Sequence, residues 1–113
     1  MEHDPKKHLY DILQAGKLIG EFTRGRTIER YRDDIILRSA VERQFQIIGE
    51  ALLQLSRRYP DVARKITDYQ SIIDFRHVLV HGYDHIEDDV VWGIVEGNLG
   101  NLIREVELLL KNL

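Results

Sequence analysis

The sequence predicts an all-α protein, and three observations lead to this prediction. Apolar residues recur at helical spacing over most of the 113 residues. Only two prolines occur: Pro5 stands where a helix would begin, and Pro60 where one would end. No alternation of apolar and polar residues is long enough to predict a sheet. We therefore expect an antiparallel bundle of four long helices and one short helix.

The first predicted helix covers about residues 5–21. Asp4 is a typical N-cap, and Pro5 suits the first helical position. The apolar side chains of this segment follow one helical face: Leu9, Ile12, Leu13, Gly16 and Ile19. The polar and basic segment 23–34 contains Gly25 as a helix breaker, so we expect a connection there.

A second long helix is predicted over about residues 33–59, before Pro60. Its apolar residues alternate in steps of four and three, which suits packing against another helix: Leu37, Val41, Phe45, Ile48, Leu52 and Leu55. Glu50 interrupts this apolar segment, either as a buried carboxylate with a partner or on the solvent side. Residues 60–66 predict one short helix.

The third long helix is predicted over residues 69–81 and the fourth over about 87–111. In the third, the residues expected to face inward are Ile72, Phe75, Leu79 and Val80. In the fourth they are Val91, Ile94, Val95, Leu99, Leu102, Val106 and Leu109, with Trp92 expected in the core or in an interface. Three glycines weaken the fourth helix and would allow close helix approach: Gly93, Gly97 and Gly100.

Composition indicates a single globular domain over residues 1–113, because 43% of the residues are hydrophobic and 31% are charged. A net charge of −3 is untypical of a general nucleic-acid coat, so any contact with RNA is expected to be local. Without cysteine, disulfides and thiolate zinc sites are excluded. We expect a cytoplasmic protein without membrane contact, because no apolar run or signal-peptide core is present.

The segment DFRHVLVHGYDH, residues 74–85, contains three of the five histidines. On a continuous helix His77 and His81 would share a face and could hold zinc or nickel. Gly82 indicates that the helix stops before His85, so the third ligand is lost. We keep this metal site as a minor alternative and expect neither a metal nor a cofactor.

Arg76 and His81 form the other candidate pair in this segment. They lie about 140° apart around a helix, so they do not share a face. If Gly82 is the C′ residue, His81 stands at the helix end and Tyr83 just beyond it. A histidine can transfer a proton near neutral pH, and a guanidinium can stabilise charge on a phosphorus-centred transition state. Nevertheless, this spacing alone is more typical of a surface pair.

Several segments resemble the HepT-like toxins of the HEPN superfamily. FRHVLVHGY is similar to their Arg-x4-His-x-Tyr motif, and the Ala-Val-x-Arg and Ile-Gly-Glu-Ala elements of residues 37–56 are typical of them. Residues 8–34 and 83–99 also resemble the family, so the similarity covers about residues 8–110. The residue after the arginine is usually polar in the family, often asparagine, and here it is His77.

This resemblance implies a homodimer in which two motifs meet in a cleft. It implies a metal-independent endoribonuclease, with Arg76 and His81 catalytic and with His77 and Tyr83 shaping the site or binding RNA. It also implies the toxin half of a toxin–antitoxin pair, whose antitoxin is a minimal nucleotidyltransferase. In some family members this partner transfers AMP to the motif tyrosine, here Tyr83. The alternative is a non-catalytic helical module that binds a nucleotide or a partner protein.

Overall fold

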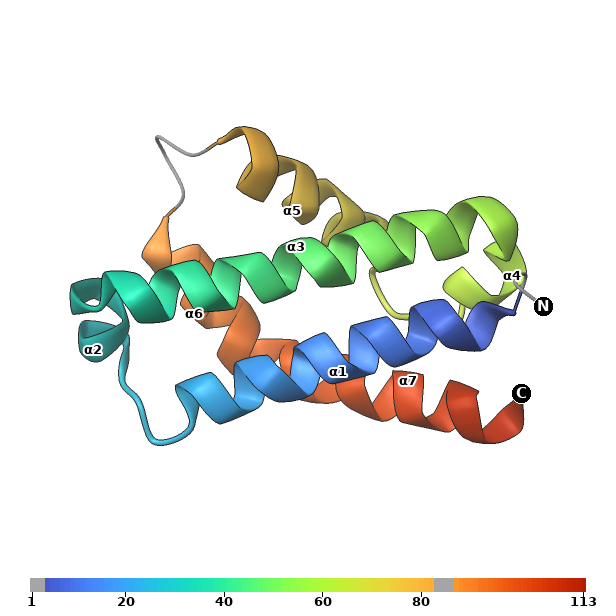
Figure 1. Ribbon diagram of the computed structural model, residues 1–113, viewed down its shortest axis with the longest axis horizontal. Helices are drawn as coiled ribbons and strands as arrows, with labels where there is room; N and C mark the ends of the chain where they lie inside the picture. Colours follow the sequence, from blue (N-terminus) through green and yellow to red (C-terminus); the bar gives the residue numbers. More distant parts are fainter. Residues whose placement is uncertain (1–3, 83–86) are drawn as a thin grey trace.

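The computed structural model describes residues 4–82 and 87–113, and within these ranges it contains helices and no strand (Figure 1). In chain order the helices are α1 (Pro5–Thr23), α2 (Ile28–Asp33), α3 (Ile35–Arg58), α4 (Pro60–Ala63), α5 (Tyr69–His81), α6 (Asp88–Gly97) and α7 (Leu99–Asn112). The predicted all-α class is therefore confirmed. None of these described helices is both long and apolar enough to cross a membrane.

Helix α1 lies between α3 and α7 and runs antiparallel to both (Figure 1). Its start is capped as predicted, because the Asp4 side chain accepts a hydrogen bond from the backbone N–H of Lys6 at 2.9 Å. The apolar face predicted for α3 is confirmed, since every one of its six residues is buried: Leu37, Val41, Phe45, Ile48, Leu52 and Leu55. These side chains form the centre of the core together with Leu9, Ile12 and Ile19 of α1.

The connection expected over residues 23–34 is confirmed for residues 24–27, where Gly25 has a φ of 71°, but it is wrong for residues 28–33, which form α2. Thr27 caps α2 by accepting a hydrogen bond from the backbone N–H of Arg30. Tyr31 is fully buried on this short helix and packs against Trp92 of α6, with ring centroids 5.3 Å apart. The burial of one aromatic ring stabilises a helix that is too short and polar to show apolar periodicity. Trp92 is thus a core residue.

The single helix expected over residues 87–111 is divided at Asn98 into α6 and α7. Asn98 has φ −123° and ends α6, and its carbonyl oxygen accepts the first bond of α7 from Leu102. Gly97 and Gly100 flank this residue, and both are poor helix formers. The expected bundle of four long helices is therefore replaced by long α1 and α3, medium α5 and α7, and shorter helices between them.

Helix α5 has the predicted bounds and packs mainly against α3 (Figure 1). Leu79 is buried as expected, and Phe75 is partly buried with its ring 5.6 Å from that of Phe45. Ile73 is also buried, whereas the inward position expected for Val80 is wrong, because this side chain is 38% exposed. Because α5 packs against α3 on one side only, apolar side chains in its last turns are exposed to solvent.

Candidate functional site

The C-terminal end of α5 carries the histidines of the predicted motif. The helix ends at His81 as expected, but Gly82 does not adopt the left-handed conformation of a C′ glycine. Its φ is −101°, and its N–H donates to the carbonyl oxygen of Val78 at 2.6 Å. A Cβ at this position would lie 2.7 Å from that oxygen. Glycine is therefore needed here for close approach to the preceding turn and not for a positive φ.

His77 and His81 lie one turn apart, and their ring centroids are 4.5 Å from each other. Both side chains are exposed. The prediction that they share a face is confirmed. Within residues 4–82 and 87–113, no three histidine, cysteine, aspartate or glutamate side chains form a group that could hold a metal ion. Tyr83 and His85, also named from the sequence, lie outside the described residues.

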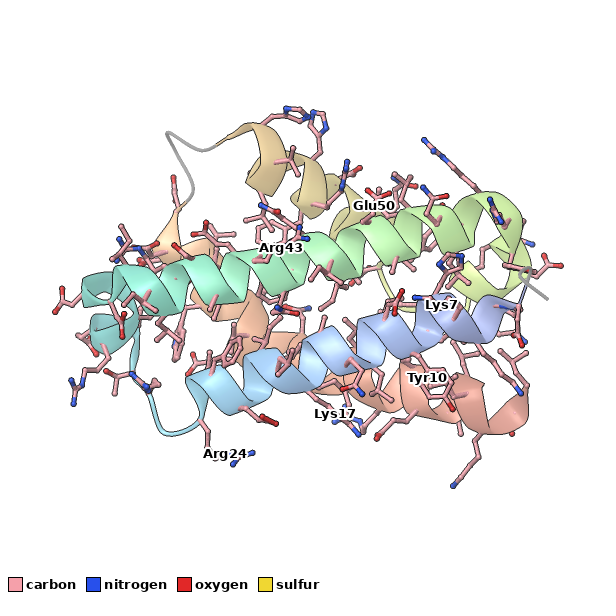
Figure 2. All side chains as sticks on the ribbon, in the orientation of Figure 1. Lys7, Tyr10, Lys17, Arg24, Arg43 and Glu50 are labelled. Atoms are coloured by element: carbon pink, nitrogen blue, oxygen red, sulfur yellow. The ribbon has the colours of Figure 1, made fainter. Side chains whose placement is uncertain are left out.

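Arg76 of α5 forms an ion pair with Glu50 of α3. Glu50 is labelled on α3 in Figure 2. Nη2 of the guanidinium lies 2.8 Å from Oε1 of the carboxylate, and the two side chains are 28% and 47% exposed. The other carboxylate oxygen of Glu50 accepts a hydrogen bond of 3.1 Å from the Gln54 side chain. The sequence left two alternatives open for Glu50, a buried carboxylate with a partner or a side chain facing solvent. The side chain has a partner, Arg76, but it is not buried.

Gly49 explains how Arg76 comes so close to α3. A Cβ built on Gly49 would lie 2.1 Å from Cβ of Arg76 and 2.8 Å from its Cγ. No side chain fits in that space, so glycine allows the first part of the arginine side chain to rest directly on the backbone of α3. Gly49 and Glu50 therefore contact the two ends of the same side chain.

The structure thus gives the two candidate catalytic residues different surroundings. Arg76 is partly buried against α3, whereas His81 is exposed beside His77 at the helix end. This agrees with the angular separation expected from their spacing. Sequence reasoning missed the contribution of Gly49 and Glu50. A glycine followed by a carboxylate within an otherwise apolar helical segment was the signal that could have revealed it.

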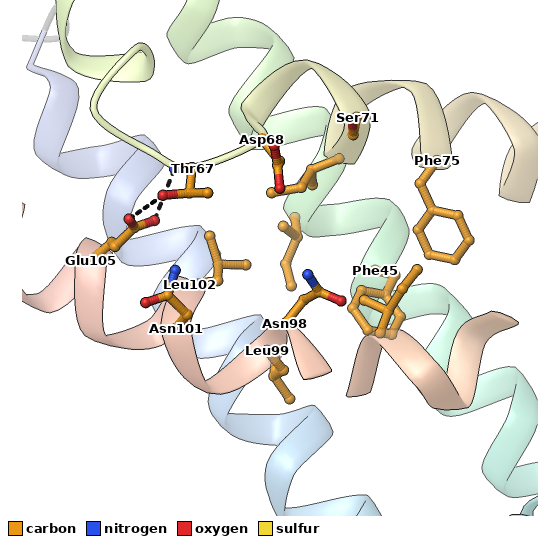
Figure 3. A pocket seen from close by; sticks show the side chains of 13 residues that line it. Phe45, Thr67, Asp68, Ser71, Phe75, Asn98, Leu99, Asn101, Leu102 and Glu105 are labelled. Atoms are coloured by element: carbon orange, nitrogen blue, oxygen red, sulfur yellow. Dashed lines mark hydrogen bonds between the residues drawn. The ribbon is translucent and has the colours of Figure 1, made fainter. Parts of the chain in front are cut away.

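A pocket of about 240 Å³ lies on another side of α5, between α3, α5 and the α6–α7 junction (Figure 3). Its walls are mainly apolar and include the edge-packed rings of Phe45 and Phe75. At one end Glu105 accepts hydrogen bonds from the backbone N–H and the hydroxyl of Thr67, at 2.9 and 2.5 Å. No pattern in the sequence predicts this pocket.

A separate polar cluster lies where α3 meets the start of α6. Arg38 and Asp88 form an ion pair of 3.8 Å at this contact. Burial raises the pKa of Glu42 above its ordinary value, and the charge of Asp88 raises it further. Burial also raises the pKa of the neighbouring Tyr31, with a smaller contribution from Glu42. Neither Glu42 nor Tyr31 was named as a candidate from the sequence. Glu42 was passed over because a single acidic residue on a helix is usually solvated.

Comparison with known proteins gives a consistent result. The profile described as "Ribonuclease HepT-like" matches residues 12–109. The protein named "Putative RNase MJ0127" from Methanocaldococcus jannaschii is 32% identical, covering 97% of this chain and 90% of its own. "Probable ribonuclease HepT" from Thermococcus cleftensis is 31% identical over 98% of this chain and 100% of its own. No solved structure matches significantly.

The profile covers residues 12–23 of α1, the whole of α2 to α6 and most of α7, so it includes every residue of the site described above. Both relatives also align with almost the full chain. The chain belongs to the HepT-like ribonuclease family.

Proposed function

We propose that this protein is a metal-independent endoribonuclease that cleaves RNA through Arg76 and His81. The observation that carries the proposal is the end of α5, which offers an exposed histidine five residues after an arginine held against α3. Membership of a ribonuclease family supports the reaction class. The two side chains are those that the chemistry requires, one for proton transfer and one for stabilising negative charge.

The proposed reaction is transesterification within the RNA strand. The 2′-hydroxyl attacks the adjacent phosphorus, the bond to the 5′-oxygen breaks, and the products are a 2′,3′-cyclic phosphate and a 5′-hydroxyl. His81 removes the proton from the 2′-hydroxyl or supplies one to the leaving oxygen. Arg76 stabilises the charge that develops on the phosphoryl oxygens. The nucleophile belongs to the substrate, so the reaction does not depend on a metal-bound hydroxide.

The proposed active form is a homodimer in which two copies of α5 face one groove. Within one chain Arg76 is directed to α3 while His81 is exposed, so a second copy would provide a histidine from the opposite side. Val78 and Val80 support this arrangement, because they leave apolar surface exposed on the same two turns, at 48% and 38%. With two histidines in one groove, one could act as the base and the other as the acid.

The dimer is tested by sedimentation of the purified protein and of Val78→Asp. We expect a dimer for the unsubstituted chain and a monomer for the variant, because a carboxylate would be desolvated in the interface. Leu108→Asp is the matched control, since Leu108 is a 60% exposed apolar residue on α7. A monomeric unsubstituted chain, or equal behaviour of both variants, would contradict the proposed dimer.

The proposed biological role is the toxin of a cytoplasmic toxin–antitoxin pair, with a minimal nucleotidyltransferase as antitoxin. This extends the family assignment to a partner. In this proposal His77 and Tyr83 shape the site or bind RNA, and transfer of AMP to Tyr83 inactivates it. Incubation of both proteins with ATP should add the mass of one AMP group to the peptide that contains Tyr83. No mass gain on that peptide would remove this mode of inactivation.

Induced expression in cells tests the ribonuclease proposal in its biological setting. Growth should stop with the unsubstituted chain and continue with Arg76→Ala or His81→Ala, and co-expression of the neighbouring nucleotidyltransferase should restore growth. Gln70→Ala is the control, because Gln70 is an exposed residue of the same helix whose side chain donates a hydrogen bond to Asp74. Equal toxicity of His81→Ala and the unsubstituted chain would contradict the proposal.

The second candidate function is a non-catalytic module that binds a nucleotide or a partner protein. The net charge of −3 favours it, because a chain that binds RNA repeatedly along its backbone is usually basic. Calorimetric titration with ATP and with the nucleotidyltransferase distinguishes the two functions. Binding with no RNA cleavage at any enzyme concentration would favour this module.

A further inference from the structure

The contact between α3 and α5 is closest where Arg76 meets Gly49. The 2.1 Å separation between Cβ of Arg76 and a Cβ built on Gly49 is shorter than any real contact, so only glycine allows this approach. Cα of Arg76 would itself lie 3.4 Å from that Cβ. The first carbons of the arginine side chain therefore have α3 on one side, and this restricts the rotamers they can adopt.

The other end of the same side chain is held by the next residue of α3. Glu50 Oε1 lies 2.8 Å from Nη2 of Arg76, and Gln54 donates to Glu50 Oε2 at 3.1 Å. Gln54 is one turn after Glu50, so it fixes the carboxylate from within α3. Arg76 is thus constrained at its stem by Gly49 and at its guanidinium by Glu50.

We propose that Glu50 is a positioning residue, which holds the guanidinium of Arg76 in the orientation that RNA cleavage requires. Glu50 acts through Arg76 and does not itself contact the reacting atoms. The inference rests on the proposed function and adds to it a residue outside the Arg-x4-His-x-Tyr motif.

The ion pair is better suited to orientation than to stabilising the fold. An ion pair whose side chains are 28% and 47% exposed is partly screened by water and contributes little to stability. A guanidinium with four rotatable bonds behind it, by contrast, loses much of its freedom when one terminal nitrogen is fixed. Catalysis depends on such preorganisation, because charge stabilisation falls steeply when a donor is misplaced by about 1 Å.

Kinetics of Glu50→Gln separate positioning from a simple effect of charge. If Glu50 positions Arg76, kcat should fall by about 10- to 100-fold while KM changes little. If the carboxylate only weakens RNA binding by its negative charge, its removal should lower KM and leave kcat unchanged, and this result would overturn the inference. Glu50→Asp keeps the charge on a shorter side chain and should recover part of kcat.

The matched control is Glu107→Gln, which removes an exposed ion pair of 3.7 Å with Lys17 on the opposite side of the bundle. Its kcat and KM should equal those of the unsubstituted protein. Thermal unfolding of both glutamine variants should stay within a few degrees of the parent, since one pair is partly exposed and the other exposed. A loss of kcat in Glu50→Gln that is matched by Glu107→Gln would overturn the specific role of Glu50.

The mobility of the guanidinium gives a readout that does not depend on activity. In protein labelled with ¹⁵N-arginine, the Nε–H signal of Arg76 is assigned by its loss in Arg76→Lys. Its heteronuclear NOE should indicate restricted motion in the unsubstituted protein and free motion in Glu50→Gln. Equal NOE values would overturn the inference even if kcat fell.

These two readouts also separate the inference from the proposed function. If the unsubstituted protein cleaves no RNA, the proposed function and the catalytic part of the inference both fail, whatever the NOE. If it cleaves RNA and Glu50→Gln has the same kcat, only the role of Glu50 fails.

Discussion

Replacing Gly49 with alanine should destabilise the protein, although alanine favours helix formation. The new Cβ would lie 2.1 Å from Cβ of Arg76, which is more than 1 Å inside the distance of ordinary contact. Both atoms are fixed to helix backbones, so α3 and α5 must move apart. Overpacking of this kind costs about 1–3 kcal/mol, and the upper end applies here because no side-chain rotation relieves it. The higher helix propensity of alanine offsets this cost by about 1 kcal/mol.

The net loss expected for Gly49→Ala is about 2 kcal/mol, which corresponds to a fall in Tm of about 8 °C for a chain of 113 residues. Calorimetry at equal protein concentrations measures this fall. Gly20→Ala is the control, because Gly20 is also inside a helix but a Cβ there meets nothing within 4 Å. It should raise Tm by about 2–4 °C. Equal stabilisation of both variants would refute the close approach of α5 to α3.

Two further predictions concern the polar cluster near α6. The buried hydroxyl of Tyr31 has no hydrogen-bond partner among the described residues, so Tyr31→Phe should leave stability unchanged or raise it by about 1 kcal/mol, measured by urea unfolding. Burial raises the pKa of Tyr31, so its contribution to stability is present below about pH 10 and is lost as pH rises further. Tyr31→Phe should lose less stability there than its parent, and an identical alkaline profile would contradict this. Burial likewise raises the pKa of Glu42 from 4.5, so the protein should lose stability as pH rises above that value. Glu42→Gln should therefore lose less stability than the parent between pH 5 and pH 7. An equal loss of stability in the variant and the parent would contradict the raised pKa of Glu42.

The long helices could be predicted from the sequence because their apolar residues follow one face without interruption. Every residue of the predicted face of α3 is buried, and α5 has the predicted bounds. The short helix α2 could not be predicted, because its stability comes from Tyr31 packing against Trp92, which is distant in sequence. The division at Asn98 was also missed, since the apolar period continues through it and only the flanking glycines indicate weakness.

In the candidate site, too, the sequence predicts relations within one helix but not contacts between two helices. The spacing of Arg76 and His81 correctly indicates that they do not share a face of α5, and the i,i+4 spacing of His77 and His81 indicates that they do. The contact of Arg76 with Glu50 joins residues from two helices, so no local pattern contains it. Gly82 was correctly expected at the end of α5, but its small size is required by the Val78 carbonyl and not by a left-handed conformation.

Cleavage of RNA by the purified protein in the presence of EDTA tests the central claim most directly. The unsubstituted chain should produce fragments that end in a 2′,3′-cyclic phosphate or its opened form. Arg76→Ala and His81→Ala should each reduce the rate by at least about 100-fold. Gln70→Ala, on an exposed part of the same helix, should keep the full rate. Intact RNA with the unsubstituted protein, or full cleavage by His81→Ala, would contradict the account.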